Sequence, residues 1–276
     1  TSKMIDKMKY FYNDLLFNYP SGQRIERLCA SRMFDNVSED NILIGNGAAE
    51  LINNLRYVVG DNIALTIPSF NEYVRCFPNA KISYINSIKN NYRLSLEELI
   101  KKLDSVDTLI VISPDNPSGS HLTFDETIKL LDRAKEKNKQ VIFDESFIDF
   151  AVNNYTLIDD EILNKYPNLI VIKSISKSYG VPGLRLGVLA SGNKDYLKII
   201  NNNLPVWNIN SFAEYFLQII NMYKKDYMHG CEQIKEERAK FYNELIKIEG
   251  LNVYPSEANY FMMQLNNGSA NELAEQ

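Results

Sequence analysis

The chain has 276 residues, of which 45% are hydrophobic and 24% charged, with a formal net charge of −5 and a pI of about 5.3. This composition is typical of a globular protein, and its acidic balance gives no reason to expect nucleic acid or an anionic membrane as a partner. No apolar run reaches the roughly 18–20 residues that a bilayer span needs, so we expect a cytoplasmic protein. Three scattered cysteines and two histidines, His121 and His229, give no disulfide framework and no histidine-rich metal site.

Short apolar runs alternate with helical patterns along the first 200 residues. The apolar runs are too uniformly apolar to be strands with one face exposed to solvent. Together with the helical patterns between them, they predict an α/β fold with a mostly parallel sheet and helices on both faces. Ser95 with Glu98 and Thr123 with Glu126 form capping-box patterns at the starts of two helices, and Ser38 is a cap or turn before a strand. The predicted strands are 41–45, 63–68, 81–86, 108–113, 140–146, 169–176 and 185–191.

The pattern changes near residue 207. Two strongly helical stretches, 211–227 and 232–250, are followed by an extended run at 258–265. Asn210 either lines a pocket or, more simply, caps the first of these helices. We therefore expect three parts: an N-terminal segment of a small domain (1–30), a large domain (31–206), and the start of a smaller α+β domain (207–276).

The segment SISKSYGVPGLRLG (174–187) directly follows a buried strand and combines a lysine, hydroxyls and a guanidinium. At a strand end Lys177 is partly desolvated, which lowers its pKa and frees the amine to attack a carbonyl. Ser174, Ser176 and Arg185 suit a phosphate dianion. An ordinary surface loop is an equally open interpretation of this segment alone.

Three further segments place polar groups after strands. Asp144 ends the buried run VIFD, where an ionised carboxylate needs a partner; a pyridinium N–H would serve, and so would a helix cap or salt bridge. Asn116, between two prolines in SPDNPSG, can donate to a ring oxygen, although such a sequence is usually just a turn. In IGNGAAELI the first N–H groups of a helix, at Gly47, Ala48 and Ala49, can bind an anion, or form a simple strand-to-helix turn.

These four segments, in this order, resemble those of fold-type I pyridoxal-phosphate enzymes, and most closely the histidinol-phosphate aminotransferases and threonine-phosphate decarboxylases. The resemblance runs from Tyr19 to the ANYF segment at 258–261. It implies pyridoxal 5′-phosphate as the cofactor, the large domain of the fold-type I transferases, and an amino donor and a keto acceptor as small-molecule partners.

The resemblance also implies residue roles. Lys177 corresponds to the lysine that holds the cofactor covalently and moves protons, and Asp144 to the residue that pairs with the pyridine nitrogen; these two are the predicted catalytic residues. Asn116 donates to the phenolic oxygen, and Phe70 in PSFNEY stacks on the cofactor face. Tyr19 resembles the tyrosine that reaches the phosphate of the neighbouring subunit, which implies a homodimer. The phosphate is expected to contact Ser174, Ser176, Arg185 and the start of the helix at Gly47, Ala48 and Ala49.

Phe147 departs from the family pattern, because a tyrosine that donates to the same ring oxygen usually stands three residues after the aspartate. Phenylalanine has no hydroxyl. The ring oxygen then stays more negative and holds the nearby proton better, so we expect a raised pKa for the cofactor-bound Lys177 nitrogen. In a spectroscopic pH titration, Phe147→Tyr should lower this pKa, and an unchanged or higher value would contradict the prediction.

A second departure is where the sequence stops. It begins without Met and ends at Gln276, inside the expected small domain, and the family's substrate-binding arginine lies beyond that point; we therefore expect a longer gene product. The leading hypothesis is an aminotransferase acting on an amino acid or phosphorylated amine. The same motifs fit decarboxylation of a phosphorylated amino acid. A non-catalytic module is a third hypothesis, against which the retained Lys177, Asp144, Asn116 and Arg185 argue.

Overall fold

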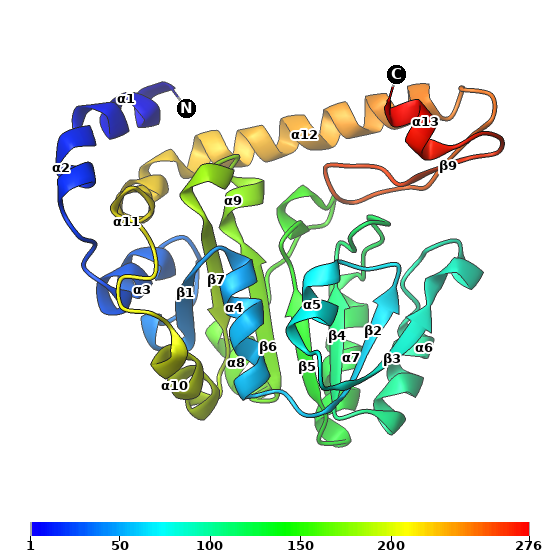
Figure 1. Cartoon of the computed structure of the whole chain (residues 1–276), viewed down its shortest axis with the longest axis horizontal. Coiled ribbons are helices and arrows are strands. Elements are labelled where there is room, and N and C mark those ends of the chain that lie inside the picture. Colours follow the sequence, from blue (N-terminus) through cyan, green and yellow to red (C-terminus); the bar gives the residue numbers. More distant parts are fainter. Residues whose placement is uncertain (1, 276) are drawn as a thin grey trace.

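The computed structural model describes residues 2–275, and a seven-stranded sheet forms its centre (Figure 1). The strands are β1 (Ile42–Asn46), β2 (Asn62–Ile67), β3 (Lys81–Asn86), β4 (Thr108–Ile112), β5 (Gln140–Asp144), β6 (Leu169–Ser174) and β7 (Leu186–Ala190). Their order is β1-β7-β6-β5-β4-β2-β3. Strands β2 to β6 pair in parallel, whereas β7 is antiparallel to both β6 and β1. The prediction of a mostly parallel sheet is confirmed.

Helices precede, connect and follow the strands. They are α3 (Gln23–Ser31), α4 (Ala48–Asn54), α5 (Asn71–Cys76), α6 (Leu96–Lys102), α7 (Phe124–Glu136), α8 (Asp160–Lys165), α9 (Ile175–Ser178) and α10 (Lys194–Asn203). Thr123 and Glu126 form the complete capping box predicted for α7. At α6 only half of the predicted box forms: Ser95 caps the helix, but the Glu98 carboxylate accepts a hydrogen bond from Asn90.

Alternate residues of each central strand pack on opposite faces of the sheet. On β5, Val141 and Phe143 belong to a core that also contains Leu130 of α7. Ile142, between them, belongs to a second core that contains Leu51 of α4. All five residues of β5 are buried, because helices cover both faces, and this explains why the run is uniformly apolar up to Asp144.

The C-terminal part is mostly helical, as predicted, with different boundaries. Its elements are α11 (Ser211–Ile219), α12 (Lys224–Leu245), β8 (Leu251–Val253), β9 (Met263–Leu265) and α13 (Ala270–Ala274). Asn210 caps α11 by accepting from the Ala213 N–H at 2.9 Å. One long helix, α12, takes in parts of both predicted helices, and of the predicted extended run only Met263–Leu265 forms a strand, paired with β8.

Helix α12 lies over the edge of the sheet where β6 ends and α9 begins (Figure 1). Tyr227 of α12 stacks on Tyr179, with the ring centroids 3.7 Å apart. Arg238 of α12 donates to the main-chain oxygens of Phe150 at 2.7 Å and Ala258 at 3.0 Å. These contacts join the C-terminal elements to the loops at that edge of the sheet.

The N-terminal helices α1 (Ser2–Tyr10) and α2 (Tyr12–Phe17) pack beside α11 at one end of the molecule (Figure 1). Across residues 2–275 we find no helix with the length and apolar character that a membrane crossing requires.

Glu26 of α3 is completely buried, and neither of its carboxyl oxygens has a hydrogen-bond partner among the described residues. Burial, together with the charges of Glu214 and Glu50, raises its pKa from 4.5 to about 7. Because the folded-state pKa is the higher one, the stability linked to Glu26 is fully present below about pH 4.5 and is lost as the pH rises through about 7.

The variant Glu26→Gln should therefore gain stability relative to the wild type as the pH rises. Between pH 5 and pH 8 we expect the difference in the free energy of unfolding to move by about 2 kcal/mol in favour of the variant. Urea denaturation at the two pH values measures it, with Glu249→Gln, on the exposed surface, as the control. Parallel pH profiles for Glu26→Gln and the wild type would show that Glu26 titrates normally.

Candidate active site

Most of the predicted site residues come together at one edge of the sheet, and Tyr19 does not. Asp144 and Ser174 are the last residues of β5 and β6, and Lys177 follows in α9. Gly47 follows β1, which runs parallel to β6, and Arg185 precedes the antiparallel β7. The carboxyl ends of the parallel strands and the start of β7 therefore meet, which is where α/β folds bind ligands.

Lys177 lies between two aromatic rings. Its Nζ is 4.3 Å from the ring centroid of Phe147 and 5.3 Å from that of Phe70. Lys177 is exposed as a whole residue, but the groups around its amine partly desolvate it and so lower its pKa; Asp144 opposes this shift and the positive charge of Arg185 adds to it. A lowered pKa leaves more of the amine neutral and able to attack a carbonyl.

A second lysine, Lys173 on β6, is fully committed to ion pairs. It is 4% exposed and its Nζ lies 2.8 Å from Asp149 and 3.5 Å from Glu145. Burial alone would lower the pKa of Lys173, but the two carboxylates outweigh it and raise the pKa overall. The pKa values of these two lysines, four residues apart, are thus shifted in opposite directions. Lys173 stays charged and has a structural role, and Lys177 is the nucleophile candidate.

Asp144 is held at both carboxylate oxygens. Its Oδ2 accepts from the Tyr73 hydroxyl at 2.8 Å and its Oδ1 from the Ser146 N–H at 3.0 Å. Asp144 is only 4% exposed and Tyr73 1%. The sequence interpretation missed Tyr73, although it lies in the same PSFNEY segment as Phe70, and three-residue spacing at a helix start brings two side chains together.

The start of α4 and the start of β7 approach very closely. A Cβ on Gly187 would lie 2.5 Å from the Ala48 nitrogen, and a Cβ on Gly47 would lie 2.6 Å from Nη2 of Arg185. Only glycine at 187 allows this approach without a shift of the backbone. The Arg185 guanidinium therefore lies beside the first N–H groups of α4, as expected for groups that share one anion.

The two serines predicted to contact the phosphate differ in their surroundings. The Ser176 hydroxyl accepts from the Leu186 N–H at 2.9 Å and donates to the Leu186 oxygen at 3.3 Å, so it ties α9 to β7. Ser174 is 6% exposed, and its own N–H donates to the Ser146 hydroxyl at 2.9 Å. The hydrogen bonds of Ser176 thus serve the protein itself, which weakens the prediction that its hydroxyl binds phosphate.

Phe147 contacts a tyrosine of the ANYF segment. The rings of Phe147 and Tyr260 meet edge to face with centroids 5.0 Å apart, and the Tyr260 hydroxyl donates to the Asp115 main-chain oxygen at 2.8 Å. Burial raises the pKa of Tyr260, and the charges of Asp115 and Asp144 add to the shift. Tyr260 therefore braces the turn that carries Asn116, a role with no local sequence signal.

Tyr19 is 77% exposed and stacks on Trp207, with ring centroids 4.2 Å apart and an interplanar angle of 17°. Across residues 2–275 no contact in the structure joins Tyr19 to Lys177 or Arg185. Its action on the phosphate of a neighbouring subunit stays a prediction.

Comparisons with known proteins show the family to which the chain belongs. The family model described as "Aminotransferase class I and II" matches residues 15–276. Over 92% of its length the chain is 32% identical to an L-serine phosphate decarboxylase from Sulfurospirillum multivorans, and over 99% it is 29% identical to a CMP-5′-(3-aminopropyl)phosphonate synthase from Streptomyces rubellomurinus. It spans 67% of the first relative and 43% of the second. The crystal structure of a histidinol-phosphate aminotransferase from Clostridium acetobutylicum superposes with a TM-score of 0.84 at 26% identity, covering 98% of this chain and 81% of that one.

The fold is that of the fold-type I pyridoxal-phosphate enzymes. The chain belongs to the class I and II aminotransferase family, and its cofactor is pyridoxal 5′-phosphate.

The described residues fit this cofactor chemically. Arg185 and the start of α4 offer donors to a phosphate, and the glycines at 47 and 187 allow these groups to approach one another closely. Asp144 offers a buried carboxylate to a pyridine N–H, and Lys177 offers an amine of lowered pKa.

Proposed function

We propose that this chain carries the cofactor site of an enzyme that acts at the Cα of a phosphorylated amino acid or amine. The observation that supports this best is the placement of Lys177. Its amine has a lowered pKa, lies 4.3 Å from the Phe147 ring centroid, and feels the charges of Asp144 and Arg185, whereas the neighbouring Lys173 is locked in ion pairs. Phosphorylated or phosphonate compounds appear in the names of the relatives described above.

Bound pyridoxal 5′-phosphate supplies an electron sink for negative charge that develops at the substrate Cα. In this chain Asp144 would hold the proton on the ring nitrogen and so keep that sink strong. Lys177 would hold the cofactor until the substrate amine displaces it, and its released amine would then take or return a proton at Cα. Arg185 and the first N–H groups of α4 would anchor the phosphate.

Decarboxylation of a phosphorylated amino acid is the first candidate reaction. It is supported by the 32% identity with an L-serine phosphate decarboxylase over 92% of the chain. Transamination of a phosphorylated amine is the second, supported by the TM-score of 0.84 with a histidinol-phosphate aminotransferase, a score that a decarboxylase from Sulfurospirillum multivorans equals. Both reactions use Asp144 in the same way; they differ in which Cα bond breaks, and so in whether Lys177 first takes a proton from Cα or gives one to it.

Two substrates separate these reactions. The holo-protein is incubated with O-phospho-L-serine, and separately with L-histidinol phosphate plus 2-oxoglutarate, and the products are identified by mass spectrometry. Release of carbon dioxide with formation of the phosphorylated amine supports decarboxylation. Appearance of glutamate with a carbonyl product establishes transamination. Bound cofactor with no product from either substrate, or from O-phospho-L-threonine, would contradict the proposal and favour a non-catalytic module.

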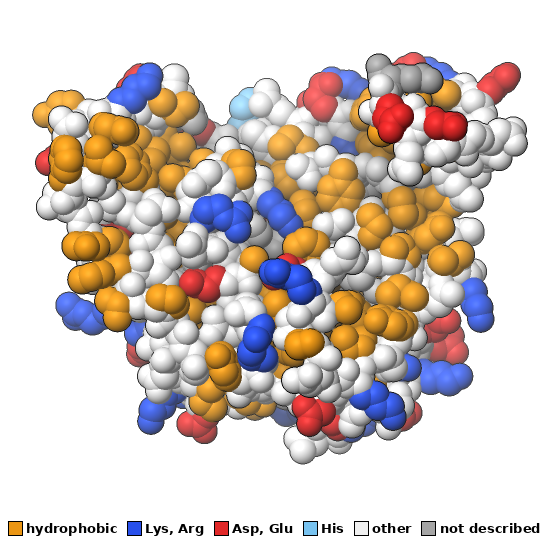
Figure 2. Space-filling model, viewed as in Figure 1, with side chains coloured by type: hydrophobic (Ala, Val, Ile, Leu, Met, Phe, Trp, Pro, Cys, Tyr) orange, Lys and Arg blue, Asp and Glu red, His pale blue; other side chains and the backbone are white. Residues whose placement is uncertain are grey.

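We also infer a homodimer, with α1 and α2 at the interface. Hydrophobic side chains gather on the surface over these helices (Figure 2), among them Tyr10 at 83% and Phe17 at 79% exposure. Tyr19 and Val206, 77% and 80% exposed, lie at the end of the same segment and beside Trp207. Burying such side chains is what stabilises a specific interface of about 800 Å² per partner.

Sedimentation velocity over a range of concentrations tests this inference. We expect the holo-protein to sediment as a dimer, and Phe17→Glu to shift it to monomer by placing a charge in the buried surface. Phe124→Glu, on α7 and away from α1 and α2, is the control; Phe124 is 42% exposed, less than Phe17. A monomeric wild type would refute the inference.

A further inference from the structure

We propose that Tyr73 is a positioning residue: its hydroxyl orients the Asp144 carboxylate and holds it in the ionised form that keeps the cofactor ring nitrogen protonated. This inference rests on the proposed role of Asp144. It assigns to α5 a function in the reaction beyond carrying Phe70.

The geometry restricts Asp144 to one orientation. The Tyr73 hydroxyl donates to Oδ2 at 2.8 Å and the Ser146 N–H donates to Oδ1 at 3.0 Å. With one donor on each oxygen, the plane of the carboxylate cannot rotate without breaking a hydrogen bond in a buried place. Each oxygen still has a free lone pair to accept from a ring N–H.

The chemistry of the pair suits this role. A phenol that donates to a carboxylate stabilises the charged form of the acid. Burial and the charge of Asp144 raise the pKa of Tyr73 well above its ordinary value, so the phenol keeps its proton and remains a donor. Without this donor the Asp144 carboxylate would lose a hydrogen bond that stabilises its negative charge, and it would hold the proton on the ring nitrogen less well.

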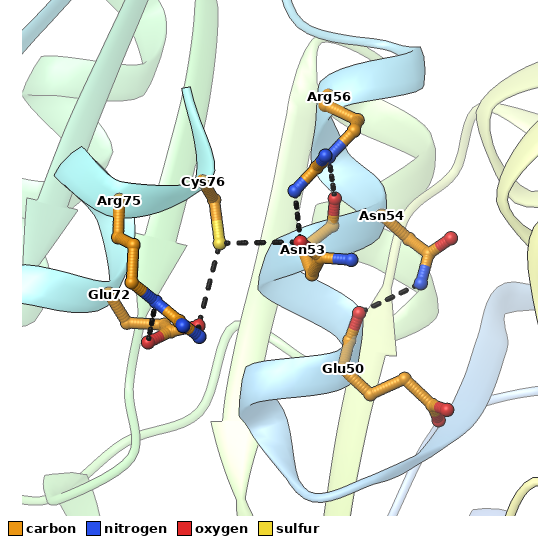
Figure 3. Close-up of polar contacts among 7 residues, drawn as sticks. All are labelled: Glu50, Asn53, Asn54, Arg56, Glu72, Arg75 and Cys76. Carbon is orange, nitrogen blue, oxygen red and sulfur yellow. Dashed lines mark hydrogen bonds and ion pairs between the residues drawn. The ribbon is translucent and has the colours of Figure 1, made fainter. Parts of the chain in front are cut away.

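Helix α5 also contacts α4 through Cys76, and Glu72 and Arg75 pair along the same helix (Figure 3). The Cys76 thiol lies 3.8 Å from Oδ1 of Asn53 on α4 and 3.5 Å from Oε1 of Glu72. Arg75 holds the same Glu72 carboxylate with two hydrogen bonds, at 2.6 Å and 3.1 Å. Anchored to α4 in this way, α5 presents Tyr73 to Asp144 from a defined position.

The same helix start carries Phe70, whose ring meets that of Tyr73 edge to face with centroids 6.5 Å apart. Lys177 Nζ lies 5.3 Å from the centroid of Phe70. Helix α5 thus carries both Phe70, whose side chain lies beside the Lys177 amine, and Tyr73, which holds the carboxylate expected to pair with the cofactor ring nitrogen. A displacement of α5 would disturb both at once.

The test is Tyr73→Phe, which removes one oxygen and keeps the ring. Its matched control is Tyr166→Phe: Tyr166 is also completely buried, and its hydroxyl donates to the carboxylate of Asp132 at 2.7 Å, away from Lys177 and Asp144. Holo-protein is prepared with cofactor labelled with ¹⁵N at the ring nitrogen, and the protonation state of that nitrogen is read from its NMR chemical shift. Melting temperatures of both variants show how much each lost hydroxyl matters to folding.

We expect Tyr73→Phe to move the ring-nitrogen signal toward the unprotonated value and to lower kcat by about 10- to 100-fold, the range for losing a hydrogen bond to a charged group. Tyr166→Phe should leave the signal unchanged. A ring-nitrogen signal in Tyr73→Phe that matches Tyr166→Phe would overturn the inference. Asp144→Asn distinguishes a failure of the role inferred for Tyr73 from a failure of the role proposed for Asp144. If Asp144→Asn also leaves the ring-nitrogen signal unchanged, the proposed role of Asp144 itself fails.

Discussion

Lys177→Ala is expected to lower turnover by more than about 10⁴-fold, because the variant loses both the covalent attachment of the cofactor and the amine that moves the proton at Cα. Some cofactor should still bind without a covalent bond, through Arg185, the start of α4 and Asp144. The measurements are the steady-state rate with whichever candidate substrate gives product in the assay described above, and the mass of the protein after borohydride reduction.

The reduced wild type should carry the mass of the cofactor on Lys177, and Lys177→Ala should not. Lys198→Ala, an exposed lysine on α10, is the control and should keep both attachment and rate. Sustained multiple turnover by Lys177→Ala would refute the assignment, whatever the reaction.

Asp144→Asn is expected to lower turnover by about 100-fold while Lys177 still binds the cofactor covalently. The amide is nearly the same size as the carboxylate and can still accept from Tyr73, but it has no negative charge to hold a proton on the ring nitrogen. The loss corresponds to roughly 3 kcal/mol, as for removal of a charged hydrogen-bond partner in a buried site.

Asp195→Asn, at the exposed start of α10, is the control for this change. Rate and borohydride-trapped mass are measured on the same preparations. The result that would contradict the prediction is an unchanged rate, or a loss of attachment equal to that of Lys177→Ala. The two variants together separate the anchoring of the cofactor from the tuning of its ring.

The opposite pKa shifts of Lys173 and Lys177 explain why a sequence with two lysines in one short segment still has a single nucleophile candidate. Lys173 points from β6 into a space where Asp149 and Glu145 meet it, and Lys177 follows the strand end and faces two aromatic rings. Only the second position leaves the amine without an ion pair.

Much of this protein follows from local sequence. The strands and the completed capping box at Thr123 depend on residues that are close in the chain, and so do the segments that carry Lys177, Asp144 and Asn116. Apolar runs predict buried strands, and polar residues directly after them predict an edge where ligands bind.

Tertiary structure alone decided the contacts that hold these site residues in place. Tyr73 and Asp144 are 71 positions apart, and Tyr260 and Asp115 are 145 positions apart, so no short motif shows that they meet. The burial of Glu26 against Glu214, 188 positions later, is equally invisible in the chain. The physical reason is that a motif records which groups are adjacent along the backbone, whereas burial, hydrogen bonding and pKa depend on which groups the folded sheet and its helices bring together in space.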